Sequence, residues 1–192
     1  MPRIFVALPL PIEAARALAG AVPDAAGLRR VAPELLHFTL AFVGQVAEER
    51  MAEVAAATDA AARGVRAFDV PIDALGRFPA TGPIRVIWAG TGPAAPLIGQ
   101  LSGRVRAELE RRAVPIDAKP VRAHITLARV REGLDAEEMS AIAMAMVAAR
   151  VPDGLRFRAD AVHVMESQLS PAGARYSSRA RILLRLTRDP AG

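Results

Sequence analysis

A seven-residue segment occurs twice in this chain, about half a chain apart. Residues 37–43 read HFTLAFV and residues 124–130 read HITLARV, so five of the seven positions are identical. The two copies contain two of the chain's three histidines, and each of these is followed two positions later by a threonine. Because side chains at positions i and i+2 of a β-strand lie on one face, each copy predicts a strand that displays a His-Thr pair. Such a repeat favours a fold with two related halves.

The residues between and beside the polar ones are hydrophobic in both copies. The predicted polar pairs are His37 with Thr39 and His124 with Thr126. The side chains expected on the opposite, core-facing side are those of Phe38, Leu40, Ile125 and Leu127. If an approximate two-fold axis relates the two halves, both polar pairs line one groove between them.

Hydrophobic periodicity predicts alternating strands and helices along the rest of the chain. Strands are predicted over residues 3–10, 35–44, 67–79, 84–90, 120–130, 155–167 and 180–186. The third is expected to pair with the fourth and the sixth with the seventh. Helices are predicted over residues 12–21, 47–63, 95–112 and 135–149, the last with Asp135 and Glu138 as a capping box.

No Ser/Gly-rich linker separates the two halves. We therefore expect one α+β domain over residues 1–192. It would consist of two pseudo-symmetric lobes, each a mainly antiparallel sheet with helices outside, and a central cleft between them.

The composition limits the chemistry that is available. There are no cysteines, which excludes disulfides, thiolate metal sites and a cysteine nucleophile. No stretch approaches the roughly 18 apolar residues of a membrane span. Pro9 and Pro11 interrupt the apolar start, so we do not expect a signal peptide. The expectation is a soluble, cytoplasmic monomer.

The charge balance favours an anionic partner. The formal net charge is +5, the pI is about 11.0, and Lys119 is the only lysine among 25 basic residues. Arginine forks bind phosphates, which fits RNA or a nucleotide. An arginine-rich and alanine-rich composition also arises from a GC-rich coding sequence, so the charge alone does not decide between the two.

Two imidazoles that face each other across a groove suit general acid–base catalysis. A neutral histidine takes a proton from an attacking water, and a protonated histidine gives one to the leaving oxygen. Threonine hydroxyls beside them can hydrogen-bond an anionic group such as a phosphodiester. This chemistry requires no metal and no other cofactor. The residues alone do not decide whether His37 or His124 is the acid.

The histidines could also have a structural role or bind a metal ion. A duplicated strand can keep its residues for packing, which accounts for the shared Leu, Ala and Val but not for the retained His-Thr pair. His163 has no threonine two positions later and is expected to be a strand or surface residue. With His37 and His124 it could form a three-histidine zinc site, although no carboxylate-rich surroundings or closely spaced ligand pair favours one.

The paired H-x-T-x motifs make the sequence similar to the 2H phosphoesterase superfamily, and in particular to its RNA 2′,3′-cyclic phosphodiesterase branch, also called 2′-5′ RNA ligase. The segments that carry the resemblance are RIFVALPLP, ELLHFTLAFVGQV, RVIWAG, VRAHITLARV and SQLSPAGARY. The resemblance implies a two-lobed fold with both motifs in a central cleft. It also implies hydrolysis of a 2′,3′-cyclic phosphate at an RNA end to a 2′-phosphate, with reverse 2′-5′ ligation as a side activity.

The same resemblance implies roles for the motif residues. His37 would protonate the leaving 3′ oxygen, His124 would activate water, and the two threonines would hold phosphate oxygens. Arg129 is a candidate phosphate contact, or else a solvated residue at the end of a strand. Ser167 is a candidate substrate contact, or else a structural residue.

The chain departs from the family pattern at three places. The family often has a basic residue just after the first motif, where this chain has Ala41. An aromatic residue often precedes that motif, where this chain has Arg30 or Val31. A tyrosine often precedes the late Glu-Ser pair, where this chain has Met165. The departures affect the expected substrate preference more than the reaction. Trp88 is expected to pack in the core.

We therefore expect a phosphodiesterase that acts on RNA ends or small nucleotides carrying a 2′,3′-cyclic phosphate. One alternative is a 2H enzyme that opens a small cyclic nucleotide without preference for RNA. Another is a non-catalytic RNA- or nucleotide-binding module. The intact His-Thr pairs argue against the module, because binding alone would tolerate the loss of an imidazole.

Overall fold

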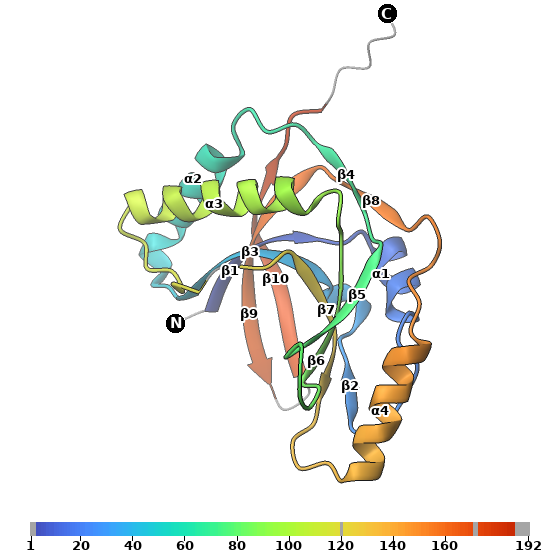
Figure 1. The fold of residues 1–192 in the computed structure, drawn as a ribbon. Helices are drawn as coiled ribbons and strands as arrows, with labels where there is room; N and C mark the ends of the chain where they lie inside the picture. The colour runs from blue at the N-terminus through green and yellow to red at the C-terminus, as the bar shows by residue number, and fades with distance from the viewer. Residues whose placement is uncertain (1–2, 120, 171–172, 187–192) are drawn as a thin grey trace, which may run out of the picture.

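The computed structural model describes residues 3–119, 121–170 and 173–186 of the chain. These residues form an α+β fold with ten β-strands and four α-helices (Figure 1). The strands are β1 Arg3–Pro9, β2 Leu28–Arg30, β3 His37–Gln45, β4 Phe68–Pro71, β5 Ala74–Phe78, β6 Val86–Gly90, β7 His124–Val130, β8 Arg156–Ala159, β9 Ala161–Ser170 and β10 Gly173–Leu183. The helices are α1 Ile12–Ala19, α2 Met51–Ala62, α3 Ala95–Arg111 and α4 Ala136–Ala148, with 3₁₀ turns at Pro33–Leu35 and Glu48–Arg50.

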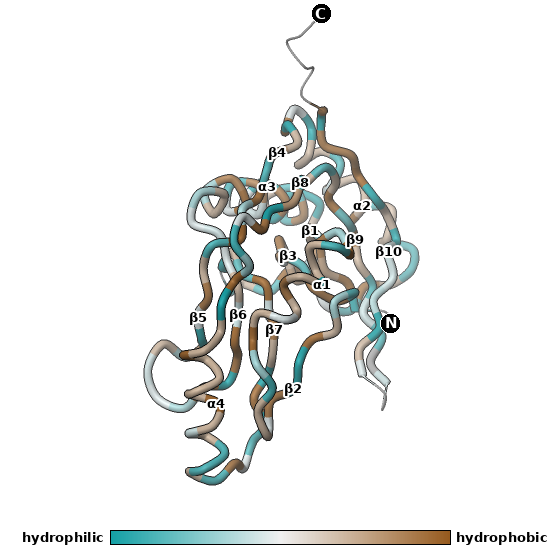
Figure 2. Tube along the Cα trace, turned by 90° about the vertical axis from the view of Figure 1, so that its right-hand side faces the viewer, coloured by the Kyte–Doolittle hydropathy of each residue, from teal (hydrophilic) through white to brown (hydrophobic). Residues whose placement is uncertain are grey.

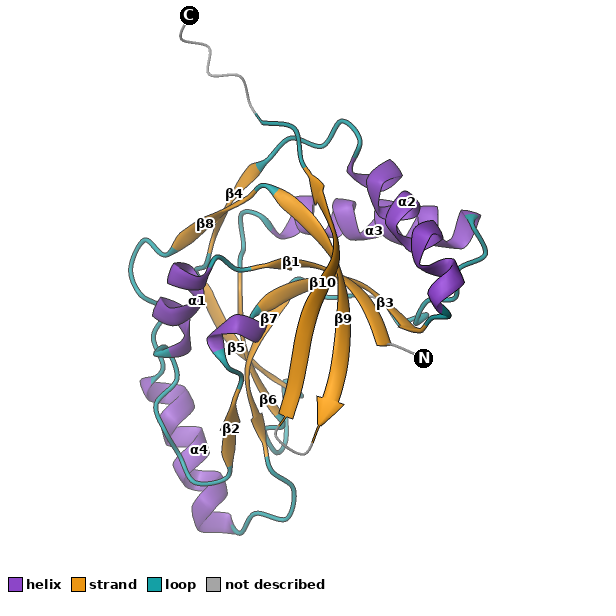
Figure 3. Ribbon diagram, turned by 180° about the vertical axis from the view of Figure 1, so that it is seen from behind, coloured by secondary structure: helices purple, strands orange, loops and turns teal. Residues whose placement is uncertain are grey.

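Most of the strands belong to two four-stranded antiparallel sheets. The order is β10-β9-β1-β3 in the first sheet and β2-β7-β6-β5 in the second, and β4 pairs with β8 in a separate ribbon. Figure 3 shows β9 and β10 side by side at the centre, with helices on both flanks. Strand β3 holds the first copy of the repeat and β7 the second, so each sheet contributes one His-Thr pair. The predicted α+β fold with two mainly antiparallel sheets is confirmed.

The hydrophobic side of both repeat copies is buried, as the alternation predicts. The four residues expected to face the core are at most 4% exposed: Phe38, Leu40, Ile125 and Leu127. Figure 2 shows hydrophobic residues between more hydrophilic ones along β7. Because successive side chains of a strand point to opposite faces, this burial directs the His-Thr pairs away from the core.

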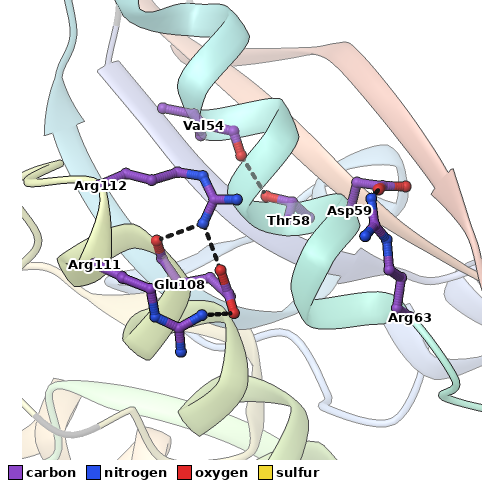
Figure 4. A network of polar contacts seen from close by, with 7 residues as sticks. All are labelled: Val54, Thr58, Asp59, Arg63, Glu108, Arg111 and Arg112. Atoms are coloured by element: carbon purple, nitrogen blue, oxygen red, sulfur yellow. Dashed lines mark hydrogen bonds and ion pairs between the residues drawn. The ribbon is translucent and has the colours of Figure 1, made fainter.

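Helices α2 and α3 pack against each other and against the first sheet, α3 on β3 and α2 on β9 and β10. The Ser102 hydroxyl of α3 donates a hydrogen bond to the Leu40 carbonyl at 2.6 Å, which fixes α3 to the first repeat strand. Near the end of α3, Glu108 forms ion pairs with Arg111 and Arg112 (Figure 4). Within the described residues, no helix is both long and apolar enough to cross a bilayer.

Helix α4 begins as the sequence predicts. The Asp135 carboxylate accepts a hydrogen bond from the backbone N–H of Glu138 at 2.8 Å, and the Glu138 carboxylate accepts one from the backbone N–H of Asp135 at 3.1 Å. The predicted capping box is therefore confirmed, and it satisfies two N–H groups that the helix itself cannot. Figure 1 shows α4 and α1 on the side of the molecule away from α2 and α3.

Two segments that the sequence predicts as single strands are each divided in the structure. Residues 67–79 form β4 and β5; only β5 pairs with β6 as predicted, while β4 pairs with β8. The chain turns at Asp73, whose carboxylate accepts a hydrogen bond from the backbone N–H of Gly92 at 2.9 Å. Residues 155–167 divide at Asp160 into β8 and β9. Periodicity does not reveal such a division, because both parts of the segment alternate in the same way.

Strand β10 differs most from its prediction. The sequence predicts a strand over residues 180–186, whereas β10 begins at Gly173 and pairs with β9 along its length. Its first half consists of small and polar residues that are exposed or half-buried, so it has no apolar alternation. The pairing with β9 defines this strand, and such a long-range partner is not visible in a local pattern.

Smaller differences concern the strands around the repeat. Strand β3 begins at His37 rather than at residue 35, because Pro33 starts a 3₁₀ turn before it. Strand β7 begins at His124, later than predicted, and Pro120 at the start of the predicted strand lies outside the described residues. Strand β2 was not predicted, since its three residues are too short for a periodic pattern.

Candidate active site

His37 is the first residue of β3, directly after the 3₁₀ turn. Its Nδ1 lies 2.7 Å from the carbonyl oxygen of Leu35. Its ring centroid lies 4.9 Å from that of Phe5 and 5.5 Å from that of Tyr176. The imidazole is therefore held by a backbone hydrogen bond and by two aromatic rings.

His124 has the same surroundings in the second sheet. It is the first residue of β7, and its Nδ1 lies 2.9 Å from the carbonyl oxygen of Arg122. The rings of Phe78 and Trp88 meet the imidazole edge-on, with centroids at 5.1 Å and 6.5 Å. A hydrogen bond to the carbonyl two residues upstream and a pair of aromatic neighbours are thus common to both histidines.

The two hydrogen bonds fix the tautomer of each imidazole. A carbonyl oxygen can only accept, so Nδ1 must carry the proton in both rings. When the ring is neutral, Nε2 then has the free lone pair and can accept a proton; when the ring is charged, Nε2–H can donate one. Both histidines therefore present the same ring nitrogen for proton transfer.

Burial lowers the pKa of both histidines. For His37, burial is the largest cause; the hydrogen bond to Leu35 raises the pKa, and the charge of His124 lowers it further. For His124, burial is again the largest cause; the Arg122 carbonyl raises the pKa, and the charges of Arg129 and Arg122 lower it. The effect of His124 on His37 means that the two imidazoles interact although they belong to different sheets. Both shifts favour the neutral imidazole in the free protein.

The threonines lie one pleat beyond the histidines, about 7 Å along each strand. Thr39 is opposite Ala7 of β1 and is 7% exposed. Thr126 is opposite Trp88 of β6 and is half-buried. We call the two sheet surfaces that carry these pairs the His-Thr faces. Each face thus presents one motif imidazole beside one threonine hydroxyl group.

Both repeat strands contain a β-bulge at the same place. The bulge leaves Leu40 of β3 and Leu127 of β7 without a partner in the ladder, and β3 has a second irregularity at Val43. Because a bulge adds one residue to its strand, the side chain of the fifth residue after each histidine points to the His-Thr face. This residue is Phe42 in β3 and Arg129 in β7. Arg129 is opposite Val86, two residues from Trp88 along β6, which places it on the same face as the second His-Thr pair.

Ser167 lies near the first His-Thr pair but is not its immediate neighbour. It is opposite Arg3 of β1 and Tyr176 of β10. Residues directly opposite in antiparallel strands share a face, so Ser167 lies beside the tyrosine whose ring contacts His37. The structure thus brings the four His-Thr residues and Arg129 together and leaves Ser167 at the margin.

Comparison with known families also points to a site made of two equivalent halves. The sequence profile of LigT-like phosphoesterases matches residues 6–88 and 91–176, which include both His-Thr pairs. The chain belongs to this family.

Individual relatives are similar over most or part of the chain. An RNA 2′,3′-cyclic phosphodiesterase of Thermus thermophilus is 31% identical over 195 residues, which cover 95% of this chain and 90% of that protein. One of Archaeoglobus fulgidus is 32% identical over 105 residues, but this match spans little more than half of each protein, 55% of this chain and 57% of the relative.

Solved structures show the same fold. A crystal structure of a Thermus thermophilus protein has a TM-score of 0.77 and 30% identity, and the match covers 97% of this chain and all of that one. Escherichia coli LigT complexed with 3′-AMP has a TM-score of 0.73 and 25% identity, covering 96% of this chain and 99% of that chain.

The aromatic residues at the site of this LigT-like phosphoesterase were not predicted from the sequence. The prediction that Trp88 packs in the core was wrong. Trp88 lies outside the hydrophobic core and stacks on Phe78 at 5.5 Å, beside His124. Gly76 leaves room for it, because a Cβ atom at this position would lie 2.1 Å from Trp88 Cζ2. A glycine inside a strand often marks such a close approach, and this was the available signal.

His163 is a strand residue, as predicted, and lies on β9 opposite Ala7. Its Nδ1 is 2.9 Å from the Ser178 hydroxyl oxygen. Among the residues that the structure describes, no three His, Cys, Asp or Glu side chains lie close enough together to hold a metal ion. The three histidines therefore do not form the zinc site that the sequence left open.

Proposed function

We propose that this LigT-like phosphoesterase hydrolyses 2′,3′-cyclic phosphate ends of RNA to 2′-phosphates, with its two motif histidines as acid and base. One observation carries the proposal: both histidines use Nδ1 to bond a carbonyl two residues upstream, at 2.7 Å and 2.9 Å, and so both keep Nε2 for proton transfer. The names of the curated relatives support the choice of substrate.

In the proposed reaction, Nε2 of His124 takes a proton from water while the water oxygen forms a bond to phosphorus. The bond between phosphorus and the 3′ oxygen breaks, and this oxygen takes a proton from Nε2 of protonated His37. The products are a 2′-phosphate and a 3′-hydroxyl group. Proton exchange with solvent then returns His124 to the neutral form and protonates His37 again. The assignment of His37 as the acid follows the family resemblance.

Substrate binding provides the protonated acid. Burial lowers the pKa of both histidines, so the free protein favours their neutral forms. A bound phosphodiester brings a negative charge next to both rings, and a nearby opposite charge raises the pKa of a histidine. The substrate therefore promotes protonation of one imidazole.

The two threonines stabilise the phosphate in this proposal. Thr39 and Thr126 each lie on the same face as a histidine, and each hydroxyl can donate to one non-bridging phosphate oxygen. Charge that develops on these oxygens in the transition state strengthens the two hydrogen bonds. The two histidines transfer both protons, so the proposed steps need no metal ion.

The same site would also support ligation. If the 5′-hydroxyl of a second RNA takes the place of water, the same bond to the 3′ oxygen breaks and a 2′-5′ phosphodiester forms. Water is far more abundant than RNA ends, so hydrolysis is the expected main reaction.

The proposal is tested by incubating the protein with an RNA oligomer that ends in a 2′,3′-cyclic phosphate, with and without EDTA, and separating 2′- from 3′-phosphate products. We expect the 2′-phosphate alone, at a rate that EDTA does not change. A 3′-phosphate product, or activity that EDTA abolishes and a divalent metal restores, would contradict the mechanism. Binding of the oligomer without turnover would identify a binding module instead.

A further inference from the structure

A buried carboxylate on the helix-covered side of the first sheet has no part in the proposed reaction. Glu166 of β9 is 8% exposed and lies opposite Ile4 of β1, a core residue. Its carboxylate accepts a hydrogen bond from the Gln168 amide at 3.0 Å and one from the Arg179 guanidinium at 2.7 Å. These two bonds lower the pKa of Glu166, which keeps the group ionised. A buried ion pair contributes little net stability, so stability alone does not account for this one.

A β-bulge in β10 places Arg179 on the same side of the sheet. The ladder with β9 passes from Ser178 to Ala180, and Arg179 between them is the extra residue. Arg179 and Ala180 both line a small cavity of about 180 Å³, whose other walls include Met51 of α2. The guanidinium therefore lies between the sheet and α2, next to Glu166.

Arg179 also joins the two edges of the sheet. Its guanidinium forms a second ion pair, with Glu48. Glu48 begins the 3₁₀ turn between β3 and α2. β10 and β3 are the two edge strands in the order β10-β9-β1-β3. One side chain thus connects the strand at one edge to the segment that follows the strand at the other edge.

On the opposite side of the sheet, the same two edge strands meet at the proposed site. Tyr176 of β10 lies three residues before Arg179, and its ring centroid is 5.5 Å from that of His37, at the start of β3. Side chains of two edge strands that are separated by two other strands touch only in a strongly twisted sheet, and a β-bulge increases the local twist. The first half of β10 is exposed or half-buried, so hydrophobic packing does little to hold it there.

We propose that Arg179 is a positioning residue for the active site: by tying β10 to Glu166 and Glu48, it holds the Tyr176 ring against the His37 imidazole. This inference rests on the proposed function, in which His37 is the acid, and it gives a role to residues outside the repeat. Arg179 acts through Tyr176, from the other side of the sheet.

The position of Tyr176 determines how strongly His37 is buried, because Tyr176 and Phe5 are the rings that meet the imidazole. Burial is the largest cause that lowers the pKa of His37; the Leu35 carbonyl raises this pKa, and the charge of His124 lowers it. If the tyrosine ring moves away, the imidazole gains contact with water and its pKa rises toward the ordinary value. The pKa of His37 therefore reports the position of the tyrosine ring.

The test uses the double variant Glu166→Gln/Arg179→Met, which breaks the ties between β10 and its neighbours. This variant keeps the net charge and leaves no ionised carboxylate buried at position 166, so it is expected to fold. NMR titration of the histidine rings measures the pKa of His37, whose signal is assigned by its absence in His37→Ala. We expect a higher pKa than in wild type, the same rise in Tyr176→Leu, and no further rise when all three substitutions are combined. The kcat for an RNA oligomer with a 2′,3′-cyclic phosphate end should fall about tenfold, because the acid is less well oriented.

Arg63→Gln is the matched control, because Arg63 forms an exposed ion pair with Asp59 at 3.1 Å at the end of α2. It should change neither the pKa of His37 nor kcat. An unchanged pKa in the double variant, with or without a lower Tm, overturns the inference, since the ion pairs would then be structural only. An unchanged pKa in Tyr176→Leu overturns it as well. The titration needs no substrate, so it is independent of activity. If wild type hydrolyses no cyclic phosphate, the proposed function fails, which is a distinct result.

Discussion

At the scale of residues, the two imidazoles are oriented in the same way by different parts of the chain. Each begins a strand and bonds the carbonyl oxygen two residues upstream. The rings around them come from four separate segments: Phe5 and Tyr176 at His37, Phe78 and Trp88 at His124. Aromatic residues are only 4% of the chain, so four of them beside two histidines is a marked concentration. These rings help to bury the two imidazoles, and this burial lowers the pKa of both His37 and His124.

The pKa shifts predict how activity depends on pH. The proposed reaction needs one protonated and one neutral histidine, and burial lowers the pKa of both below the ordinary value of 6.5 in the free protein. The singly protonated, reactive form is therefore most populated at a pH below 6.5 and is lost as the pH rises from there. We expect kcat/KM, which reports the free enzyme, to fall about tenfold per pH unit above neutrality.

In the proposed mechanism the bound phosphodiester raises the histidine pKa, so kcat should decline at a higher pH than kcat/KM does. Steady-state kinetics on a cyclic-phosphate substrate between about pH 5 and pH 9, at constant ionic strength, measure both profiles. A kcat/KM that rises through pH 7 and stays high would show that no histidine acts as the acid.

The sequence revealed the polar residues of the site but not their aromatic neighbours. The His-Thr pairs could be predicted because strand geometry puts positions i and i+2 on one face, and the repeat marks both copies. Phe5 and Tyr176 are far apart in the chain and meet only through the β1–β9–β10 pairing. No local pattern predicts such a contact.

At the scale of elements, the second half-site depends on the close approach of β5 and β6. Gly76 of β5 is opposite Trp88 of β6, whose ring occupies the space that a side chain at position 76 would need. The ring in turn stacks on Phe78 and meets His124 edge-on. A glycine on one strand thus positions an aromatic residue beside a proposed catalytic group.

Gly76→Ala should therefore displace the Trp88 ring, because the new Cβ would lie 2.1 Å from Cζ2. We expect the free energy of unfolding to fall by about 1–3 kcal/mol, the usual cost of overpacking. Trp88 is the only tryptophan, so its fluorescence emission reports the displacement directly.

Gly99→Ala is the matched control, since a Cβ atom on this exposed helical residue meets nothing within 4 Å. It should raise the free energy of unfolding by about 0.5–1 kcal/mol. Denaturant titration measures both variants. An unchanged emission spectrum and stability for Gly76→Ala would show that the ring is not held by this contact.

Elements with a strong local pattern were predicted well, and elements defined by distant partners were not. The capping box at Asp135 sets the start of α4 by contacts within four residues, and it was predicted from the sequence. The first half of β10 has no apolar alternation and is a strand because β9 pairs with it. The division of residues 67–79 into β4 and β5 likewise depends on the partner strands β8 and β6.

At the scale of the whole molecule, the proposed site is divided between two sheets. The first sheet contributes His37 and Thr39, and the second contributes His124 and Thr126. Buried residues of both sheets form one hydrophobic cluster, which holds the two halves together. The single two-lobed domain, the monomeric state and the cytoplasmic location stay predictions. The central claim is that each half supplies one of two proton transfers.

Rates of hydrolysis for His37→Ala, His124→Ala and His163→Ala, measured on one RNA oligomer with a 2′,3′-cyclic phosphate end, test this claim most directly. Each of the first two variants should lose about 10²–10⁴ in kcat, because each lacks one proton transfer. His163→Ala removes the third histidine, which bonds Ser178 on β9 and β10, and should keep the wild-type rate. Circular dichroism confirms that the variants fold. Near wild-type turnover in either His37→Ala or His124→Ala would contradict the two-histidine mechanism.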